Sequence, residues 1–265
     1  MPAEIIAVAN HKGGVGKSFT AVSLASGMAH AGWRTLLVDC DAQANATSMF
    51  DPDDQVEFDL LDVIVRGVES AKAVLSTRVV GLDLLGATLD VARLDQELIT
   101  RHYREEQVRR ALAPLLDDYD VMVLDLSPNL GQLVITALNA ATGLIVPTDA
   151  TKWGRRGVTM FLDWAEELRR ADVLSAELLG IVLTKYESRT QISREVLDDL
   201  RRSDWPIFNT LIPKRIAAER MVANMQVVGD PEADHDLSEA YANLTAEVLE
   251  RMVASVARRG RHSRG

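Results

Sequence analysis

The chain has 265 residues, of which 47% are hydrophobic and 26% charged, the composition of a globular protein. Its formal net charge of −10 argues against a protein that coats nucleic acid or an anionic membrane by overall attraction. The single cysteine, Cys40, excludes an internal disulfide and a paired-cysteine metal site, and we expect a buried filler. No apolar stretch is long enough to span a bilayer and residues 1–10 lack signal-peptide features, so we expect a cytoplasmic protein.

Short apolar runs alternate with longer amphipathic segments along the chain. The predicted strands are 4–10, 34–39, 79–86, 120–125, 143–147, 178–184 and 206–212. The predicted helices are 17–31, 58–67, 90–117 (broken), 129–141, 154–172, 190–202, 215–225 and 237–258. The runs 35–38 and 121–124 are continuously apolar, which favours strands buried on both faces of a parallel sheet. The pattern predicts a doubly wound α/β fold, with helices on both faces of a mostly parallel sheet. We expect one domain over residues 1–257 and a disordered basic tail over 258–265.

The most informative segment is residues 11–18, which read His-Lys-Gly-Gly-Val-Gly-Lys-Ser. It follows the apolar run 5–9 and precedes the helix-like stretch 18–31, so strand, glycine-rich loop and helix come in the order that a phosphate-binding loop requires. Backbone N–H groups of such a loop surround phosphate oxygens, and the helix N-terminus adds its dipole. Lys17 would then contact the β- and γ-phosphates, and the Ser18 hydroxyl would bind Mg²⁺.

The segment departs from the usual phosphate-loop pattern at its start, where His11 replaces the first glycine and Lys12 adds a second lysine. This form resembles the deviant Walker A loop of the ParA/MinD ATPase family. In that family the additional lysine reaches the phosphates bound by a partner subunit. The resemblance therefore implies a homodimer that encloses two ATP molecules with Mg²⁺, and a catalytic role for Lys12 and Lys17. The residues expected to bind the nucleotide in this loop are Lys12, Gly13, Gly14, Val15, Gly16, Lys17, Ser18 and Phe19.

Two aspartates, Asp39 and Asp41, follow the second predicted strand, at the sheet edge where ligands bind in this class of fold. Their stretch resembles the family's D-x-D-P-Q-G-N segment, which implies that Asp41 orients or deprotonates the attacking water and that Asp39 supports the Mg²⁺ ligands. The chain has Ala42 and Ala44 where the family usually has proline and glycine, so we expect a less rigid loop. Two solvated loop acids are the alternative.

Two further strand ends complete the predicted site. The apolar run 121–124 ends in Asp125, the Walker B pattern in which a carboxylate holds Mg²⁺ directly or through water. Residues 183–190 and 211–214 resemble two later segments of the family. The second of these lies near the adenine in the family, so Pro213 is the candidate base contact. A strand end followed by a turn is the alternative for both.

The resemblance implies an ATP-dependent switch that partitions chromosomal or plasmid DNA. The ATP dimer would bind nonspecific DNA on the nucleoid, and a ParB-like centromere-binding protein would stimulate slow hydrolysis. The candidate DNA-binding residues are Arg201, Arg202, Lys214, Arg215 and Arg220. A solvated charged face is the alternative for these residues. The stretch 230–234 is acidic where the family often carries arginines, which would weaken DNA binding or shift it to Arg155, Arg156 or the tail.

Other classes of function stay open at this point. A MinD-like membrane switch needs a C-terminal amphipathic helix with large apolar anchors, whereas residues 250–265 supply only Met252, Val253 and Val256 beside a basic tail, so membrane binding is not expected. A metabolic enzyme on the same loop is a second class. The lone cysteine excludes a relative of the nitrogenase iron protein, and Lys12 is unusual for a dethiobiotin synthetase relative. A positioning ATPase for a non-DNA cargo has the same sequence features as the DNA switch.

Overall fold

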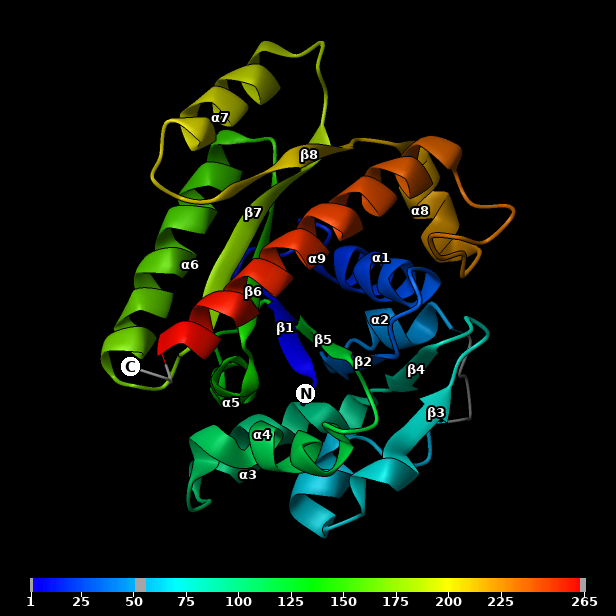
Figure 1. Cartoon of the computed structure of the whole chain (residues 1–265), viewed down its shortest axis with the longest axis vertical. Helices are drawn as coiled ribbons and strands as arrows, with labels where there is room; N and C mark the ends of the chain where they lie inside the picture. Colours follow the sequence, from blue (N-terminus) through cyan, green and yellow to red (C-terminus); the bar gives the residue numbers. More distant parts are fainter. Residues whose placement is uncertain (1, 51–55, 263–265) are drawn as a thin grey trace.

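The computed structural model describes residues 2–50 and 56–262. Its strands form one sheet in the order β3-β4-β2-β5-β1-β6-β7-β8 (Figure 1). The strands are β1 (Glu4–Val8), β2 (Thr35–Cys40), β3 (Val74–Ser76), β4 (Leu82–Leu85), β5 (Val121–Leu126), β6 (Gly143–Asp149), β7 (Glu177–Tyr186) and β8 (Ile207–Pro213). Neighbouring strands run parallel, except that β3 is antiparallel to β4. The predicted α/β fold with a mostly parallel sheet is confirmed.

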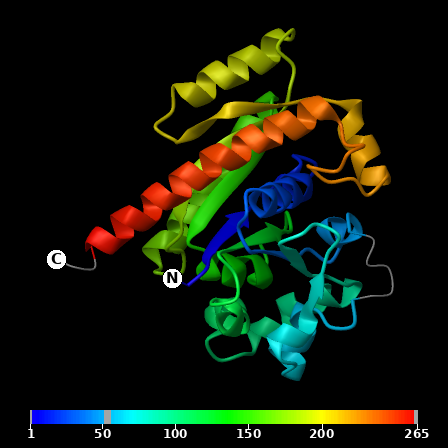
Figure 2. The same ribbon diagram turned by 45° about the vertical axis from the view of Figure 1, so that its right-hand side comes forward.

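Helices cover both faces of this sheet (Figures 1 and 2). The α-helices are α1 (Lys17–His30), α2 (Asn45–Ser48), α3 (Leu94–Ile99), α4 (Gln107–Leu112), α5 (Gln132–Ala140), α6 (Lys152–Arg170), α7 (Gln191–Arg201), α8 (Ile216–Ala223) and α9 (His235–His262). A π-helical segment η1 (Asp62–Arg66) and four 3-10 segments, η2 (Ser70–Ala73), η3 (Leu89–Arg93), η4 (Arg104–Glu106) and η5 (Ala113–Leu115), connect them. Helices α1, α8 and α9 pack on one face, and α3 to α6 pack on the other.

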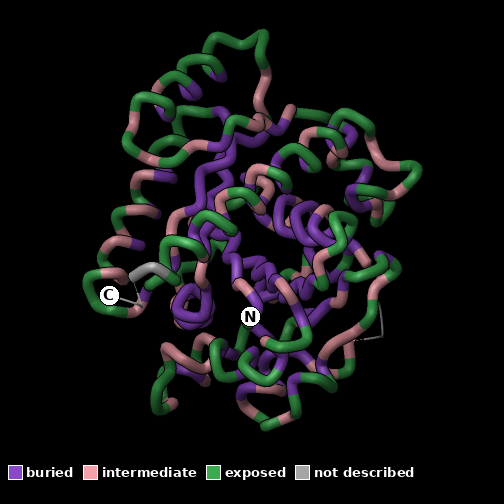
Figure 3. The backbone as a smooth tube through the Cα atoms, in the orientation of Figure 1, coloured by how far each residue is buried: buried purple, intermediate pink, exposed green. Residues whose placement is uncertain are grey.

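The central strands are buried on both faces, as their continuous apolar sequences predict. In β1, Ile5 and Ala7 belong to the core under α3 to α6, whereas Ile6 and Val8 belong to the core under α1 and α9. Figure 3 shows this buried centre, with exposed residues on the outer helices. Cys40 at the end of β2 is 1% exposed, which confirms the predicted buried filler. Two cores on one sheet fix the positions of the strand ends that carry the predicted site.

Segments β3, β4 and η1 are among those that differ from the sequence-based prediction. Strand β3 was not predicted, because three residues are too few to show a period. The strand predicted over 79–86 is shorter, since Gly81 takes a left-handed conformation (φ 84°) in the turn that precedes β4. The helix predicted over 58–67 ends as the π-helical turn η1, which Gly67 closes with φ 74°. These differences lie at one edge of the sheet, away from β1, β5 and β6.

The disordered tail predicted over 258–265 is wrong for residues 258–262, because α9 continues through His262. Arg258 forms an ion pair with Glu177, and Arg259 forms one with Glu4. Both acids lie at the start of strands, so the basic tail is held by acids far away in the sequence. Residues 263–265 lie outside the described residues. Among the helices of residues 2–50 and 56–262, α9 included, none is long and apolar enough to cross a membrane.

Candidate functional site

The glycine-rich loop leads from β1 directly into α1. Gly14 and Gly16 adopt positive φ angles of 72° and 82°, which side chains other than glycine rarely tolerate. Gly16 precedes the first residue of α1, Lys17, and provides no side chain that could cap the helix. The first N–H groups of α1 and the helix dipole therefore face the loop, in the arrangement that binds phosphate.

Strand β7 anchors this loop through contacts that the sequence did not reveal. The Thr184 hydroxyl donates to the Val15 carbonyl at 2.8 Å, and Lys185 Nζ donates to the Gly14 carbonyl at 2.6 Å. Lys185 holds a left-handed backbone conformation (φ 52°), so its position carries local strain. The two hydrogen-bonded pairs are 169 and 171 residues apart in the sequence, so no local sequence pattern could have predicted these contacts.

Lys17 points into the loop, where it is only 7% exposed. Its Nζ donates to the Lys12 carbonyl at 3.1 Å. Burial lowers the pKa of Lys17, and the carboxylates of Asp125 and Asp41 partly oppose this effect. A phosphate group beside Lys17 would stabilise its charge in the same way, because it would add negative charge in a region that excludes water.

Lys12 takes a different direction from Lys17. Its Nζ donates to both carboxylate oxygens of Asp149, at 2.8 and 2.7 Å, and to Thr151 Oγ1 at 3.3 Å. Asp149 ends β6, and Thr151 caps α6 by accepting a hydrogen bond from the Gly154 N–H. The two lysines of the loop are thus separated, with one inside the loop and one held at its side.

Asp125 is the penultimate residue of the buried strand β5 and lies beside Asp39 of β2, its partner in the strand register. It is fully buried, and neither of its carboxylate oxygens has a hydrogen-bond partner among the described residues. Burial raises the pKa of Asp125 well above its ordinary value, the charge of Asp39 raises it further, and the Ser18 hydroxyl partly opposes this shift. An unpartnered buried carboxylate next to a serine hydroxyl fits a Mg²⁺ site, because oxygen ligands and a charge to neutralise are both present.

Asp39 is equally buried but fully hydrogen-bonded. Its Oδ1 accepts from the Asp41 N–H at 3.0 Å, and its Oδ2 accepts from the N–H and hydroxyl of Thr47 at 2.9 and 2.8 Å. Burial is the largest effect on Asp39 and raises its pKa to about 6, although these hydrogen bonds lower it. The structure therefore places Asp39 where it shapes the loop from Asp41 to Thr47.

Asp41 lies at the start of that loop and faces a cavity of about 610 Å³, which it shares with His11, Gln43 and Ser127. Ala44 takes a left-handed conformation (φ 50°), the one that the glycine usual at this position would adopt freely. Its N–H donates to the Asp41 carbonyl at 2.8 Å. Ala44 thus adopts the turn that glycine would form, and its left-handed conformation places backbone strain close to Asp41.

A second cavity, of about 370 Å³, lies on the other side of the loop and contains Pro213. Phe19 and Tyr241 line it and pack edge to face, with ring centroids 5.4 Å apart. Lys185 and Glu219 supply polar groups at its wall. An aromatic and apolar slot beside the phosphate loop has the properties expected of a base pocket. Phe19 and Pro213, both predicted nucleotide contacts, are brought together here.

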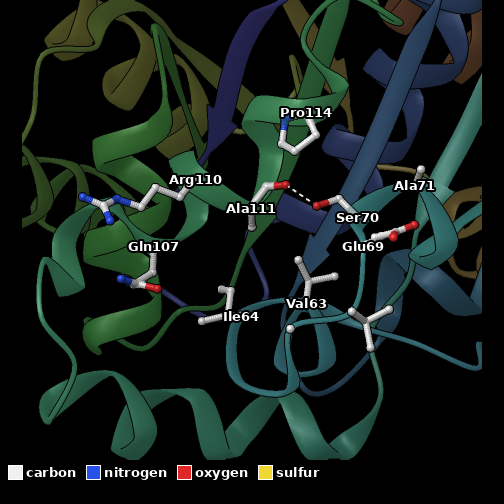
Figure 4. Close-up of a pocket in the computed structure, with 11 residues that line it drawn as sticks. Val63, Ile64, Glu69, Ser70, Ala71, Gln107, Arg110, Ala111 and Pro114 are labelled. Carbon is white, nitrogen blue, oxygen red and sulfur yellow. Dashed lines mark hydrogen bonds between the residues drawn. The ribbon is translucent and has the colours of Figure 1, made fainter.

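A third cavity, of about 460 Å³, lies away from the loop, between η1, η2 and α4 (Figure 4). Val63, Ile64 and Ala111 form much of its wall, and the Ser70 hydroxyl donates to the Ala111 carbonyl inside it. Among the described residues that line it, none is a predicted site residue. The candidate site is therefore assigned to the phosphate loop and its two flanking cavities.

The candidate DNA-binding residues do not form one cluster. Arg201 and Arg202 precede β8, whereas Lys214 and Arg215 follow it, so seven residues of strand, roughly 20 Å, separate the pairs. Several of these cations already have acidic partners: Arg202 with Asp199 (3.5 Å), Lys214 with Glu187 (3.3 Å), Arg215 with Asp236, and the substitute candidate Arg155 with Asp199 (3.0 Å). Arg220 lines a cavity with Glu232 and Asp234 of the acidic stretch. The substitute candidate Arg156 lies over the Trp153 ring.

Comparison with known proteins identifies the family. Residues 3–178 match the family model described as an AAA domain. The chain is 30% identical to the sporulation initiation inhibitor protein Soj of Bacillus subtilis (strain 168), over 92% of this chain and 98% of Soj. It is 31% identical to the chromosome partitioning protein ParA of Caulobacter vibrioides (strain NA1000 / CB15N), over 94% of this chain and 95% of that protein. This chain is a member of the ParA-type ATPases. The resemblance of its loop to the ParA/MinD superfamily is thereby confirmed.

A solved structure agrees with this ParA-type assignment in fold. Cobyrinic acid a,c-diamide synthase from Mycobacterium smegmatis, with bound ADP and magnesium, is 32% identical to this chain. The match covers 94% of this chain and 95% of that chain, with a TM-score of 0.81. The same protein has also been solved with an ATP analogue and magnesium. These ligands are in keeping with the ATP and Mg²⁺ that the loop and Asp125 predict.

Replacing Asp125 should have opposite effects on the stability of the nucleotide-free protein and on the binding of Mg²⁺. We expect Asp125→Asn to raise the free energy of unfolding of the nucleotide-free protein by on the order of 1 kcal/mol, because it removes an unpartnered buried carboxylate beside Asp39. The same change should abolish the additional stability that Mg²⁺ gives in the presence of ATP. Thermal denaturation with and without Mg²⁺ and ATP measures both effects. A destabilised nucleotide-free variant would contradict this view of Asp125.

Proposed function

We propose that this ParA-type ATPase is an ATP-dependent dimerising switch for DNA partitioning. Its nucleoid-associated ATP dimer binds nonspecific DNA, and slow hydrolysis, stimulated by a ParB-like centromere-binding protein, returns it to monomers. The relative named chromosome partitioning protein ParA supports the partitioning role. The site supports control of the dimer by nucleotide, since the phosphate loop, the buried carboxylate of Asp125 and the apolar pocket at Pro213 all lie at the carboxyl ends of the strands.

The observation that carries the proposal is the separation of Lys12 from Lys17. Lys17 is buried inside the loop, in position to contact the phosphates bound by its own subunit. Lys12 lies at the side of the loop, where its side chain is 26% exposed and directed to Asp149. This second cation lies outside its own loop, and in the dimer it would leave Asp149 for the partner's phosphates. It would act there as an arginine finger does when supplied in trans.

The remaining residues divide the chemistry among them. Lys17 and the loop N–H groups neutralise part of the phosphate charge, which is the main requirement of phosphoryl transfer. Ser18 and Asp125 would hold Mg²⁺, which would supply further positive charge there. Asp41 orients the attacking water from the cavity that it lines. Asp39 acts by holding the Asp41 loop through its three hydrogen bonds. Each site is complete only when two subunits associate, so ATP binding controls dimerisation.

The alternatives differ in what the dimer binds. A positioning ATPase for a non-DNA cargo, or a MinD-like membrane switch, would use the same site with another surface. Arg258 and Arg259, in the last turns of α9, are paired with Glu177 and Glu4, which leaves less free positive charge for an anionic membrane. The synthase named among the solved structures raises a metabolic alternative. DNA binding controlled by ATP distinguishes the switch from all of these.

The direct test is binding of nonspecific duplex DNA with ATP, with ADP and without nucleotide, measured by gel shift. We expect binding with ATP alone. Lys12→Ala alone should bind ATP but fail to form a dimer with itself and fail to shift DNA, with a stimulated hydrolysis rate roughly 10³-fold lower or more. Lys17→Ala serves as the matched control, because it should lose ATP binding itself. Equal DNA binding with ATP and ADP would refute the switch.

Asp41 has a separate role and gives a separate prediction. Asp41→Ala should keep ATP-dependent dimerisation and DNA binding, since Asp41 contacts the attacking water rather than the phosphates. Its hydrolysis rate should fall by roughly 10²–10⁴-fold, the usual contribution of a positioned base. Phosphate release and size-exclusion chromatography on one preparation measure both. Loss of the dimer together with hydrolysis would instead assign Asp41 to the interface.

The two separated basic pairs allow the DNA-binding surface to be located. Lys214 and Arg215 follow β8 at the nucleotide edge, where dimer formation can reach them. We expect Lys214→Ala with Arg215→Ala to weaken ATP-dependent DNA binding and to lower its salt dependence by about one to two phosphate contacts. Arg201→Ala with Arg202→Ala is the matched control and should have the smaller effect. The reverse order would place the surface at the end of α7.

A further inference from the structure

We propose that Asp149 is a positioning residue that holds Lys12 on its own subunit and so opposes dimerisation until nucleotide binds. This inference rests on the proposed function, because it concerns the lysine that acts on the partner's nucleotide. Lys12 directs its three N–H donors to Asp149 and Thr151, so none is left for the phosphates of a second subunit while this contact lasts. Each dimer that forms must therefore break two Lys12–Asp149 pairs.

The contact is well defined in geometry. Lys12 Nζ lies 2.8 and 2.7 Å from the two Asp149 oxygens, and 3.3 Å from Thr151 Oγ1. The side chains of Lys12 and Asp149 are 26% and 15% exposed, so water screens this pair less than it screens an ion pair on the open surface. All three donor positions of the ammonium group are directed to oxygen atoms of the β6–α6 junction.

The fold builds this junction next to the loop. Strands β1 and β6 are neighbours in the sheet, so their carboxyl ends emerge together (Figure 1). The buried Asn10 side chain accepts from the Lys12 N–H at 3.1 Å and donates to the Pro147 carbonyl of β6 at 2.8 Å. The backbone of Lys12 is thereby fixed to the same strand that carries Asp149. Strand β6 therefore positions both the backbone of Lys12, through Asn10, and its Nζ atom, through Asp149.

Gly154 makes room for the carboxylate. A Cβ atom at this position would lie 2.3 Å from Asp149 Oδ1 and 2.2 Å from the Asp149 carbonyl oxygen, which no side chain could accommodate without movement. The first turn of α6 therefore closes tightly over Asp149. The absence of a side chain at residue 154 permits the position in which Asp149 meets Lys12.

Release of Lys12 does not leave Asp149 without support. The Thr151 hydroxyl donates to Asp149 Oδ1 at 2.7 Å, independently of Lys12. Asp149 also lies two residues before Thr151, the N-cap of α6, near the helix end where the dipole favours a negative charge. Lys12 can thus leave without stranding a buried carboxylate. Lys12 can therefore exchange Asp149 for another anion, which is what a reversible switch requires.

The test compares Asp149→Asn and Asp149→Ala with the wild-type chain. Asp199→Asn is the matched control, because it removes the carboxylate that pairs with Arg155 of the same helix α6, without contact to the loop. Sedimentation equilibrium with Mg²⁺ and a non-hydrolysable ATP analogue measures dimerisation. The rate at which acetic anhydride modifies Lys12 without nucleotide, followed by peptide mass spectrometry, measures how far Lys12 is held.

We expect modification of Lys12 to become roughly two- to fivefold faster in Asp149→Asn and faster still in Asp149→Ala, which corresponds to the loss of a partly exposed ion pair. The dimer dissociation constant should fall by roughly tenfold, because two pairs no longer have to break. Asp199→Asn should change neither value. Unchanged modification of Lys12, or a dimer that is unchanged or weaker in Asp149→Asn, would overturn the inference.

The two measurements also separate this inference from the proposed function. If neither wild type nor variant dimerises with the analogue, the switch is wrong, and the role of Asp149 in opposing dimerisation falls with it. If wild type dimerises and the Asp149 variants dimerise no better, the switch stands and only the inference about Asp149 fails.

Discussion

The charge balance at the carboxyl edge of the sheet is the constraint on which this structure depends. Asp39 and Asp125 are buried side by side at the ends of β2 and β5. Lys17 is the buried cation facing them, and its pKa is lowered by burial even so. Hydrogen bonds satisfy Asp39, whereas both oxygens of Asp125 lack a partner within the described residues. Such a site is incomplete without a divalent cation and a phosphate, so ligand binding changes the electrostatics of the whole edge.

The parts of the site that follow local patterns could be predicted from the sequence. Lys17 and Ser18 open a helix after a glycine-rich loop, and Asp125 closes an apolar strand, so each is recognisable from its neighbours in the chain. The central strands were predictable for the same reason. Continuous apolar runs produce strands buried on both sides, whatever their order in the sheet.

The parts that depend on long-range contacts could not be predicted. Asp149 meets Lys12 across 137 residues, and Lys185 reaches Gly14 across 171. These partners follow from the order of β1, β6 and β7 in the sheet, which no local pattern specifies. The helical end of α9 was missed for a related reason. Its basic composition suggests a solvated tail, but Glu4 and Glu177 lie where they can pair with Arg259 and Arg258.

The central claim is that Lys12 completes the site of the partner subunit. Mixing two inactive variants, Lys12→Ala and Asp41→Ala, tests it most directly by steady-state phosphate release. In a mixed dimer, the site of the Lys12→Ala subunit keeps its own Asp41 and receives Lys12 from the other subunit. The account predicts that hydrolysis returns on mixing, with a maximum at intermediate ratios of the two proteins. If Lys12 served its own subunit, every site in the mixture would lack one group, and no ratio would restore hydrolysis.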